Sequence, residues 1–300
     1  MVECEINQHQ EVNMLEIITD SASDIPAALR EKYHLHVIPT PVVIDGVDYL
    51  DGETLSPDEF YQIQREGKQQ ISTYHINPDM FEQAFLPYAR EGKQVIYICF
   101  STGIAATFNA AHVALETIRE QYPEFDLTIV DSRCASAGFG LMVLNLLRLK
   151  EKGAGKEVIL EAVDFYRNHI RHVFTVETLE YLVKGGRVSR PKGALAGTLD
   201  IRPILTVDEN GSLKIMKLVR GRKRSLKALA EYVKEQGRDL ELQTVAFCHG
   251  EMMEAVTEVM GLIGVALSDP VISQVGCAIG AHTGSQILGV CFLDAPDPYR

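Results

Sequence analysis

Hydroxyl and carboxyl side chains follow three apolar runs in the first half of the chain. The pairs Ser21/Ser23, Ser101/Thr102 and Asp131/Ser132 come directly after residues 15–19, 95–100 and 127–130. Such residues cap helices, and helix N-termini also bind small anions because free backbone N–H groups point outward there. The pattern leaves two interpretations open, helix capping and a binding site for a small anionic group.

Two segments of the second half hold further residues suited to anion binding. His282 lies between glycines in GAHTGSQILG (280–289), and we expect it beside a small, flexible turn that lets the backbone approach a ligand. Arg187 follows Gly185-Gly186, where a short helix is expected to end. A guanidinium binds carboxylates or phosphates in a bidentate manner, although Arg187 could equally cap the helix and His282 could be structural.

Ser101, Asp131 and His282 supply the three side-chain types of a hydrolytic triad. The sequence contains no G-x-S-x-G elbow, no complete phosphate-binding loop, no dinucleotide fingerprint and no H-E-x-x-H. His169 and His172 could share a helix face, but they lack the carboxylates of a metal site. We therefore predict no metal and no cofactor, and keep a lipid or small-ester hydrolase using Ser101 and His282 as the alternative function.

The chain has one basic cluster, RGRKRS, which contains Arg220, Arg222, Lys223 and Arg224. Its formal net charge is −12, which argues against general nucleic-acid binding because that requires basic surface. The cluster is either the solvated end of a hairpin or a docking patch for an acidic partner or phosphate-rich ligand. A further hypothesis is a lipid sensor that acts on transcription through this basic cluster.

The elements that position these residues follow from the apolar periodicity. Short apolar strands alternate with helices over residues 104–118 and 133–149, which predicts a parallel sheet with both faces covered. Ser56 and Asn77, each followed by proline, predict two further helix starts. Strand ends then meet at one edge of the sheet, where ligands of such folds bind.

After a glycine- and lysine-containing linker at 152–156 the pattern changes. It predicts a hairpin at 202–219 that turns at Asn210-Gly211, helices at 225–236 and 251–263, and strands at 244–248, 271–280 and 287–293. We predict an α/β protein: a disordered tail (1–13), an N-terminal parallel-sheet α/β domain (14–153) and a C-terminal mixed α+β domain (154–300).

Composition restricts the location of the protein. Apolar residues make up 46% of 300, without an uninterrupted apolar run long enough to cross a bilayer. The first residues are acidic and polar, unlike a signal peptide, and the six cysteines have no metal-binding or disulfide spacing. These features predict a cytoplasmic protein.

Several segments in order resemble the DegV family of fatty acid-binding proteins. They include IITDSASD (17–24), ISTYHINPDMF (71–81), STGIAATF (101–108), IVDSRCASAGFG (129–140), TLEYLVKGGRVS (178–189), RPIL with RGRKRS, CHG (248–250) and IGAHTG (279–284). The sequence departs from the family pattern at Tyr74, Ala105-Ala106 and Ser285.

The resemblance implies a DegV-like fold that holds one long-chain fatty acid in an apolar tunnel between its domains. It implies that Thr73, Ser101, Thr102, Arg187, His282 and Thr283 bind the carboxylate. It further implies a non-catalytic carrier, which presents the carboxylate to an ATP-dependent fatty acid kinase subunit for acyl-phosphate formation. Residues 220–224 would then contact the kinase.

Overall fold

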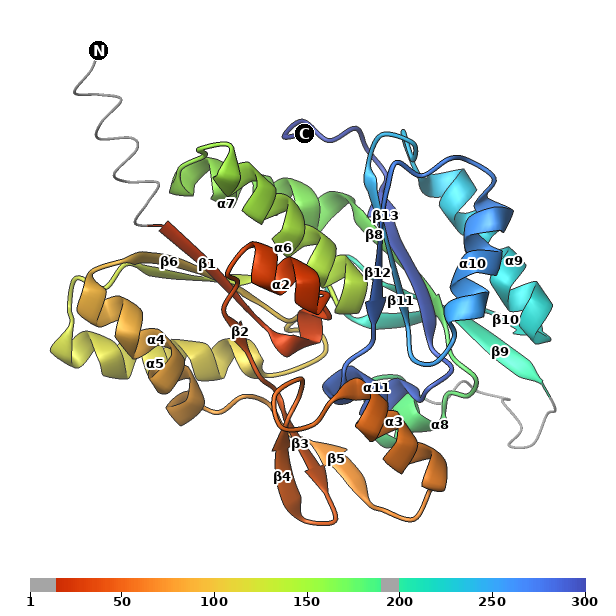
Figure 1. Cartoon of the computed structure of the whole chain (residues 1–300), viewed down its shortest axis with the longest axis horizontal. Helices are drawn as coiled ribbons and strands as arrows, with labels where there is room; N and C mark the ends of the chain where they lie inside the picture. Colours follow the sequence, from red (N-terminus) through yellow and green to blue (C-terminus); the bar gives the residue numbers. More distant parts are fainter. Residues whose placement is uncertain (1–14, 190–199) are drawn as a thin grey trace.

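The computed structural model describes residues 15–189 and 200–300, so the expected tail at 1–13 lies outside the described residues. These residues form three sheets whose strands come from separate stretches of the chain (Figure 1). No helix among them is both long and apolar enough to cross a membrane.

The first sheet is parallel, as the alternating pattern predicts, and has the order β2-β1-β6-β7. Its strands are β1 (Leu15–Asp20), β2 (Val37–Ile38), β6 (Gln94–Cys99) and β7 (Leu127–Asp131). The helices α2 (Ala27–Lys32), α4 (Pro78–Glu91) and α5 (Thr107–Gln121) lie between these strands in the chain, and α6 (Ser136–Glu151) follows the last of them. Buried residues of α4 and α5 pack on one face, and those of α6 pack on the other.

A small antiparallel sheet interrupts the first one and has the order β4-β3-β5. It consists of β3 (Pro41–Ile44), β4 (Val47–Leu50) and β5 (Ile71–Thr73), with α3 (Pro57–Glu66) beside it. The predicted starts of α3 and α4 are confirmed. Ser56 forms a capping box with Glu59 at the start of α3, and Asn77 is the N-cap of α4, which begins at Pro78. This sheet was not predicted from the sequence, because its strands have only three or four residues each and are too short to show a clear alternation.

The third sheet is mixed and has the order β10-β9-β8-β13-β11-β12. Its strands are β8 (Ile170–Thr175), β9 (Ile201–Val207), β10 (Leu213–Arg220), β11 (Thr244–His249), β12 (Asp269–Gln274) and β13 (Leu288–Leu293). Helices α9 (Arg222–Gln236) and α10 (Met253–Ile263) cover one face, and together with the sheet they form a separate core. His172 lies in β8 and His169 ends α7 (Lys156–His169), so the expected shared helix face is wrong.

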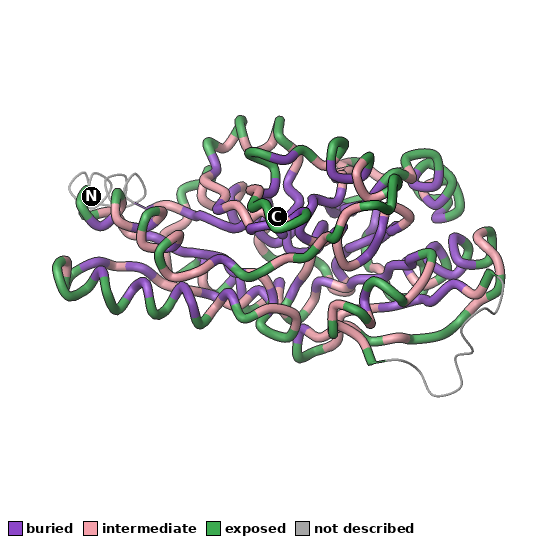
Figure 2. The backbone as a smooth tube through the Cα atoms, turned by 90° about the horizontal axis from the view of Figure 1, so that it is seen from below, coloured by how far each residue is buried: buried purple, intermediate pink, exposed green. Residues whose placement is uncertain are grey.

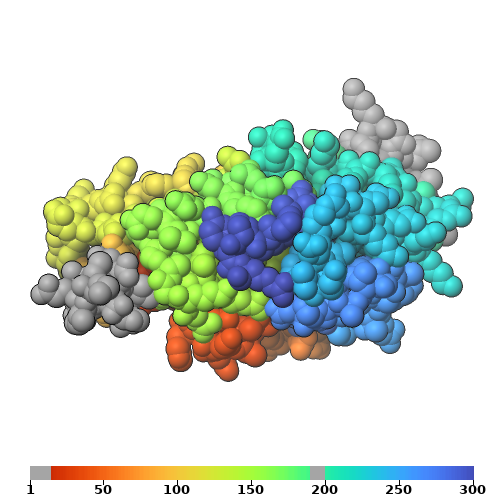
Figure 3. Space-filling view, turned by 90° about the horizontal axis from the view of Figure 1, so that it is seen from above, coloured from red at the N-terminus to blue at the C-terminus, as the bar shows by residue number. Residues whose placement is uncertain are grey.

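Helix α6 joins the two large sheets. Of its 16 residues, 13 are buried, and they pack against β1 on one side and against β8, β11 and β13 on the other. Figure 2 shows buried backbone concentrated in the middle of the molecule, with exposed backbone along its outer helices. The C-terminal residues lie over the region around α7 (Figure 3), where Tyr299 packs on Phe165 and Tyr166.

The first two sheets use only residues before 153, and the third uses only residues after 154. Two expectations within the second half are wrong. Residues 271–280 are not one strand, because β12 ends at Gln274 and α11 (Cys277–Thr283) follows Gly276. The predicted hairpin forms from β9 and β10 and turns through Asp208–Ser212, where the Asp208 N–H donates to the Ser212 carbonyl and the Gly211 N–H to the Asp208 carbonyl. The positive φ expected at both Asn210 and Gly211 occurs only at Gly211.

Candidate functional site

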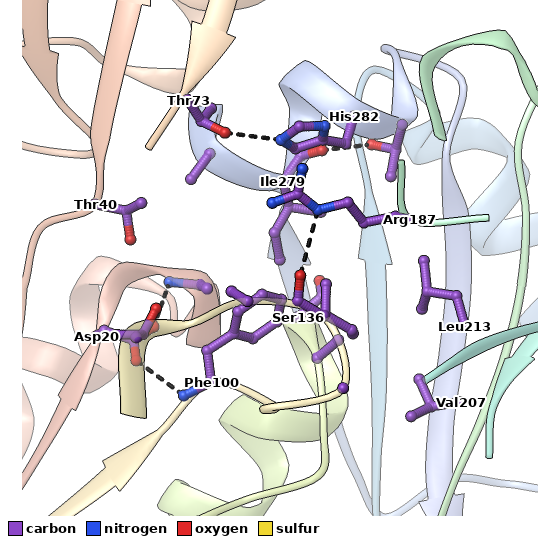
Figure 4. A pocket seen from close by; sticks show the side chains of 18 of the residues that line it. Asp20, Thr40, Thr73, Phe100, Ser136, Arg187, Val207, Leu213, Ile279 and His282 are labelled. Carbon is purple, nitrogen blue, oxygen red and sulfur yellow. Dashed lines mark hydrogen bonds between the residues drawn. The ribbon is translucent and has the colours of Figure 1, made fainter. Parts of the chain in front are cut away.

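A cavity of about 620 Å³ lies where the two halves meet (Figure 4). Its walls come from the ends of β1 and β6, from α5, α6 and α11, and from β8, β9, β11 and β13. Most of its lining is apolar: Ala22, Phe100, Ile104, Ala105, Ala106, Phe108, Ala135, Val173, Phe174, Leu182, Val207, Leu213, Cys248, Ala278, Ile279, Ile287, Gly289 and Cys291. A volume of this size accommodates a small-molecule ligand rather than a few waters.

One end of the cavity carries a histidine held by a threonine. His282, near the end of α11, shares a 2.8 Å hydrogen bond between its Nε2 atom and Oγ1 of Thr73 in β5 (Figure 4). Burial, together with the positive charge of Arg187, lowers the pKa of His282 to about 4. The imidazole is therefore neutral at physiological pH. His282 lies on a helix and not on the flexible turn that its glycines suggested.

Arg187 lies beside this histidine, after α8 (Glu180–Lys184) ends at Gly185 as predicted. Its Nη1 donates to the carbonyl of Gly185 at 2.6 Å, and its Nε donates to the carbonyl of Ile104 at 3.3 Å. The guanidinium is half-buried, and burial lowers its pKa. Among the described residues no aspartate or glutamate forms an ion pair with Arg187, whose hydrogen-bond partners are the two backbone carbonyls. Its charge therefore faces the cavity end without a carboxylate from this part of the protein.

Gly185 permits this arrangement. A Cβ atom on Gly185 would lie 2.3 Å from Nδ1 of His282, which is closer than such contacts allow. The first glycine of the Gly185-Gly186 pair is thus required by the approach of the imidazole ring, and its φ of −75° is ordinary. Gly186 supplies the positive φ that turns the chain toward Arg187.

Two buried carboxylates of the N-terminal half position α11. Asp24 accepts a 2.8 Å hydrogen bond from the backbone N–H of Gly276, and Asp51 accepts one of 2.8 Å from Cys277 and one of 3.2 Å from Ala278. Burial raises the pKa of Asp24 to about 8 and also raises the pKa of Asp51. Free N–H groups at a helix start need acceptors, so these contacts explain why residues after 276 are helical.

The hydroxyls after the parallel strands do meet at one sheet edge, but they serve other contacts. Ser101 is fully buried outside the cavity lining, and its Oγ donates to the carbonyl of Gly211 at 2.7 Å. Ser21 donates to Asp51, Ser23 to the backbone of Asp20, and Ser132 to the backbone of Cys134. Ser101 therefore joins the first sheet to the β9–β10 turn.

The three residues of the hydrolase alternative are not joined in the structure. Asp131 accepts from Oγ1 of Thr102 at 2.6 Å, Ser101 donates to Gly211, and His282 pairs with Thr73. A triad requires the histidine to lie between the serine and the carboxylate. These hydrogen bonds give no support to the hydrolase alternative.

The remaining expected ligand residues line the cavity but are already bonded. Thr102 is exposed at its rim, and Thr283 is buried with its Oγ1 donating to the carbonyl of Ile279 at 3.1 Å. Ala105 and Ala106, which stand where the family pattern has a Ser-Gly pair, also line the cavity. Tyr74 is 40% exposed at the rim, and the Ser285 carbonyl accepts from the Glu251 N–H.

The basic cluster lies on the surface of the second half. Arg220 ends β10, while Arg222, Lys223 and Arg224 form the first turn of α9. Arg222 approaches Glu258 at 3.4 Å, and Lys223 and Arg224 are exposed. Asp24, Asp51 and His172 were not among the predicted site residues, although Asp20 and Asp24 flank Ser21 and Ser23 at a strand end and so indicated a polar cluster there.

Fold and cavity together define an α/β protein of two large sheets and one small sheet, with a mainly apolar chamber that has one cationic end. A family model described as uncharacterised protein, DegV family, matches residues 14–295, and the chain belongs to the DegV family. A DegV domain-containing protein of Clostridium perfringens is 33% identical over 287 residues, covering 94% of this chain and 98% of that protein. One from Caldanaerobacter subterraneus is 34% identical, with 92% and 97% covered.

Solved structures of the same fold are similar over nearly the whole chain. A DegV family protein of Thermus thermophilus, described by its fatty acid binding, has a TM-score of 0.83 and 26% identity, with 93% of this chain and 99% of that chain covered. A DegV lipid-binding protein of Thermotoga maritima has a TM-score of 0.81 and 28% identity, covering 92% and 97%. A stearic acid-binding protein of Eubacterium ventriosum has a TM-score of 0.84 and 25% identity, covering 93% and 97%.

Proposed function

We propose that this protein binds one long-chain fatty acid in the cavity between its halves. The observation that carries the proposal is the half-buried Arg187 beside the neutral His282, at one end of a mainly apolar chamber. A carboxylate there would accept hydrogen bonds from Arg187 and from the Thr73–His282 pair. The similar proteins that are described as binding fatty acids support the same ligand class.

Apolar contact supplies most of the affinity in this proposal. Each buried methylene contributes ~0.8 kcal/mol, so a chain of about sixteen carbons gains roughly 11–12 kcal/mol before the costs of association. The polar end mainly fixes the direction of the chain, because an unpaired carboxylate inside the protein is strongly unfavourable. Of the residues expected to bind the carboxylate, we propose Thr73, Arg187 and His282 as the direct contacts. Thr102 and Thr283 line the same cavity, whereas Ser101 lies outside its lining.

Organic extraction of the purified protein followed by mass spectrometry tests this function. We expect one fatty acid for each protein molecule, and native mass spectrometry of His282→Ala should show reduced occupancy. Gly261→Ala is a suitable control, because a Cβ atom there has no neighbour within 4 Å. Absence of fatty acid from the extract, together with no uptake of added fatty acid, would rule out the proposal.

We further propose that the protein is a non-catalytic, cytoplasmic carrier that presents the carboxylate to an ATP-dependent kinase subunit. Lys223 and Arg224 support a docking role for the basic cluster, because cations in the first turn of α9 oppose the helix dipole and reduce local stability. Exposed cations at a helix start, where they reduce stability, are suited to binding an acidic partner protein.

Acyl phosphate formation with a kinase subunit tests the carrier role. The loaded protein with ATP and the kinase should yield acyl phosphate, trapped as a hydroxamate, and neither protein alone should. Lys223→Glu with Arg224→Glu should raise the KM for the loaded carrier and leave fatty acid affinity unchanged. Lys68→Glu, an exposed site outside the cluster, is the matched control. Equal KM values for both variants would remove the cluster from the interface.

A further inference from the structure

His172 is a buried histidine inside the cavity whose second ring nitrogen has no protein partner among the described residues. Only 5% of this residue is exposed, and it belongs to the cavity lining. Its Nε2 accepts a hydrogen bond from the backbone N–H of Ala135 at 3.3 Å. Burial is the main cause that lowers its pKa, to about 4, so the ring is neutral. The single ring hydrogen must then lie on Nδ1.

We infer that the Nδ1–H group of His172 faces the cavity, because Nδ1 has no partner among the described residues and is not fully covered. In the described residues, three side-chain atoms are fully covered and have no hydrogen-bond partner, one each in Gln69, Arg167 and Arg202. Nδ1 of His172 is not one of these fully covered atoms. Nδ1 therefore keeps accessible surface, and the cavity is the space that this residue lines. Polar groups at such depth are almost always bonded, so a free donor here indicates a missing acceptor.

The ring is held firmly in this orientation. A Cβ atom on Gly138 would lie 2.1 Å from Nε2 of His172, so the ring rests directly on the backbone of α6. The His172 carbonyl accepts a 2.7 Å hydrogen bond from Oγ1 of Thr206, which fixes β8 at His172 against β9, the strand that contains Val207. Val207 and Leu213 lie in Figure 4 at a distance from Thr73 and His282, toward the apolar part of the cavity. His172 belongs to β8 and forms no hydrogen bond with Thr73, Arg187 or His282 among the described residues, so its donor is separate from the cationic end.

We propose that His172 selects an acyl chain that carries an oxygen substituent, a hydroxyl or keto group, in the part remote from its carboxylate. This proposal rests on the proposed function, since it assigns the ligand class of the same cavity. An unsubstituted acyl chain beside His172 would cover the Nδ1–H group without offering it an acceptor. A covered donor without an acceptor weakens binding. An oxygen at the matching carbon restores the hydrogen bond.

Competition binding to the delipidated full-length protein tests this selection. The probes are octadecanoic acid and a positional series of its monohydroxy derivatives. We expect one hydroxyl position to bind about tenfold more tightly than the plain acid, equivalent to ~1.4 kcal/mol, because one neutral hydrogen bond is gained. His172→Phe should abolish that preference, so that the tenfold ratio between the preferred hydroxy acid and the plain acid falls to about one. His172→Asn, whose amide can place a donor near the Nδ1 position, should retain part of it.

The outcomes separate the two proposals. If the wild-type protein binds octadecanoic acid and prefers no hydroxyl position, the selection by His172 is refuted and fatty acid binding stands. If it binds none of the probes, the proposed function itself fails. A preference that persists unchanged in His172→Phe would assign the selection to another residue and overturn this inference.

Discussion

Replacing Arg187 by methionine is the sharpest test of how the cavity recognises a carboxylate. Methionine keeps a flexible apolar side chain of similar reach and removes the charge. The guanidinium is half-buried and has no acidic ion-pair partner among the described residues, so a bound carboxylate would be its counterion. A charge-assisted hydrogen bond contributes ~1.5–3 kcal/mol, and partial exposure places the expected loss at the lower end. We expect a loss of affinity of roughly 10- to 30-fold.

The assay compares a fatty acid with the primary alcohol of the same chain length in both proteins. Wild type should prefer the acid by about that factor, and Arg187→Met should bind acid and alcohol almost equally, because the alcohol never used the positive charge. Arg187→Lys should retain part of the preference. The variant also loses the bonds to Gly185 and Ile104, so its folding is checked by thermal unfolding. An acid-to-alcohol ratio identical in wild type and Arg187→Met would refute the assignment.

Three further predictions follow from contacts around the site. Gly185→Ala should weaken fatty acid retention without removing any ligand group, because the new methyl displaces the His282 ring; Gly261→Ala should have no such effect. Ser101→Ala should leave fatty acid affinity unchanged and lower stability by about 1–3 kcal/mol, since the Gly211 carbonyl loses its donor. Asp24→Asn should be at least as stable as wild type at neutral pH in chemical denaturation.

The last prediction has a defined pH dependence. The folded-state pKa of Asp24 is raised to about 8, so its contribution to stability is complete below the unfolded pKa near 4 and is lost as pH rises through 8. Asparagine does not titrate, and the stability gain of Asp24→Asn over wild type should therefore grow between pH 4 and 8. A gain that shrinks with rising pH would show that Asp24 is ionised in the folded protein.

Contradicting results for the other two variants are equally specific. Unchanged retention in Gly185→Ala would mean that the imidazole position does not affect the ligand. A large loss of affinity in Ser101→Ala, with an unaltered melting temperature, would return Ser101 to the binding site. Either result would require a different carboxylate end of the cavity.

Local sequence signals determined the elements that form by short-range rules. The parallel strands at 15–20, 94–99 and 127–131 are continuous apolar runs, and such runs need both faces covered. The Ser56 capping box and the Asn77 cap are satisfied within three residues of themselves. Gly185-Gly186 ends α8 as predicted, because Gly186 adopts the positive φ that glycine permits at the end of a helix. These features were predictable because the interactions that stabilise them are close in the sequence.

Tertiary structure alone decided the site. Residues 277–283 became a helix because Asp24 and Asp51, more than 220 residues earlier, accept hydrogen bonds from its first N–H groups. Ser101 lay at the expected strand end, yet the β9–β10 turn took its hydroxyl. The sequence by itself determined the fold class and the residues available for an anion, Arg187 and His282 among them. Which of those residues face the cavity depended on contacts between distant segments, since each hydroxyl or carboxylate bonds to whatever group folding brings within about 3 Å of it.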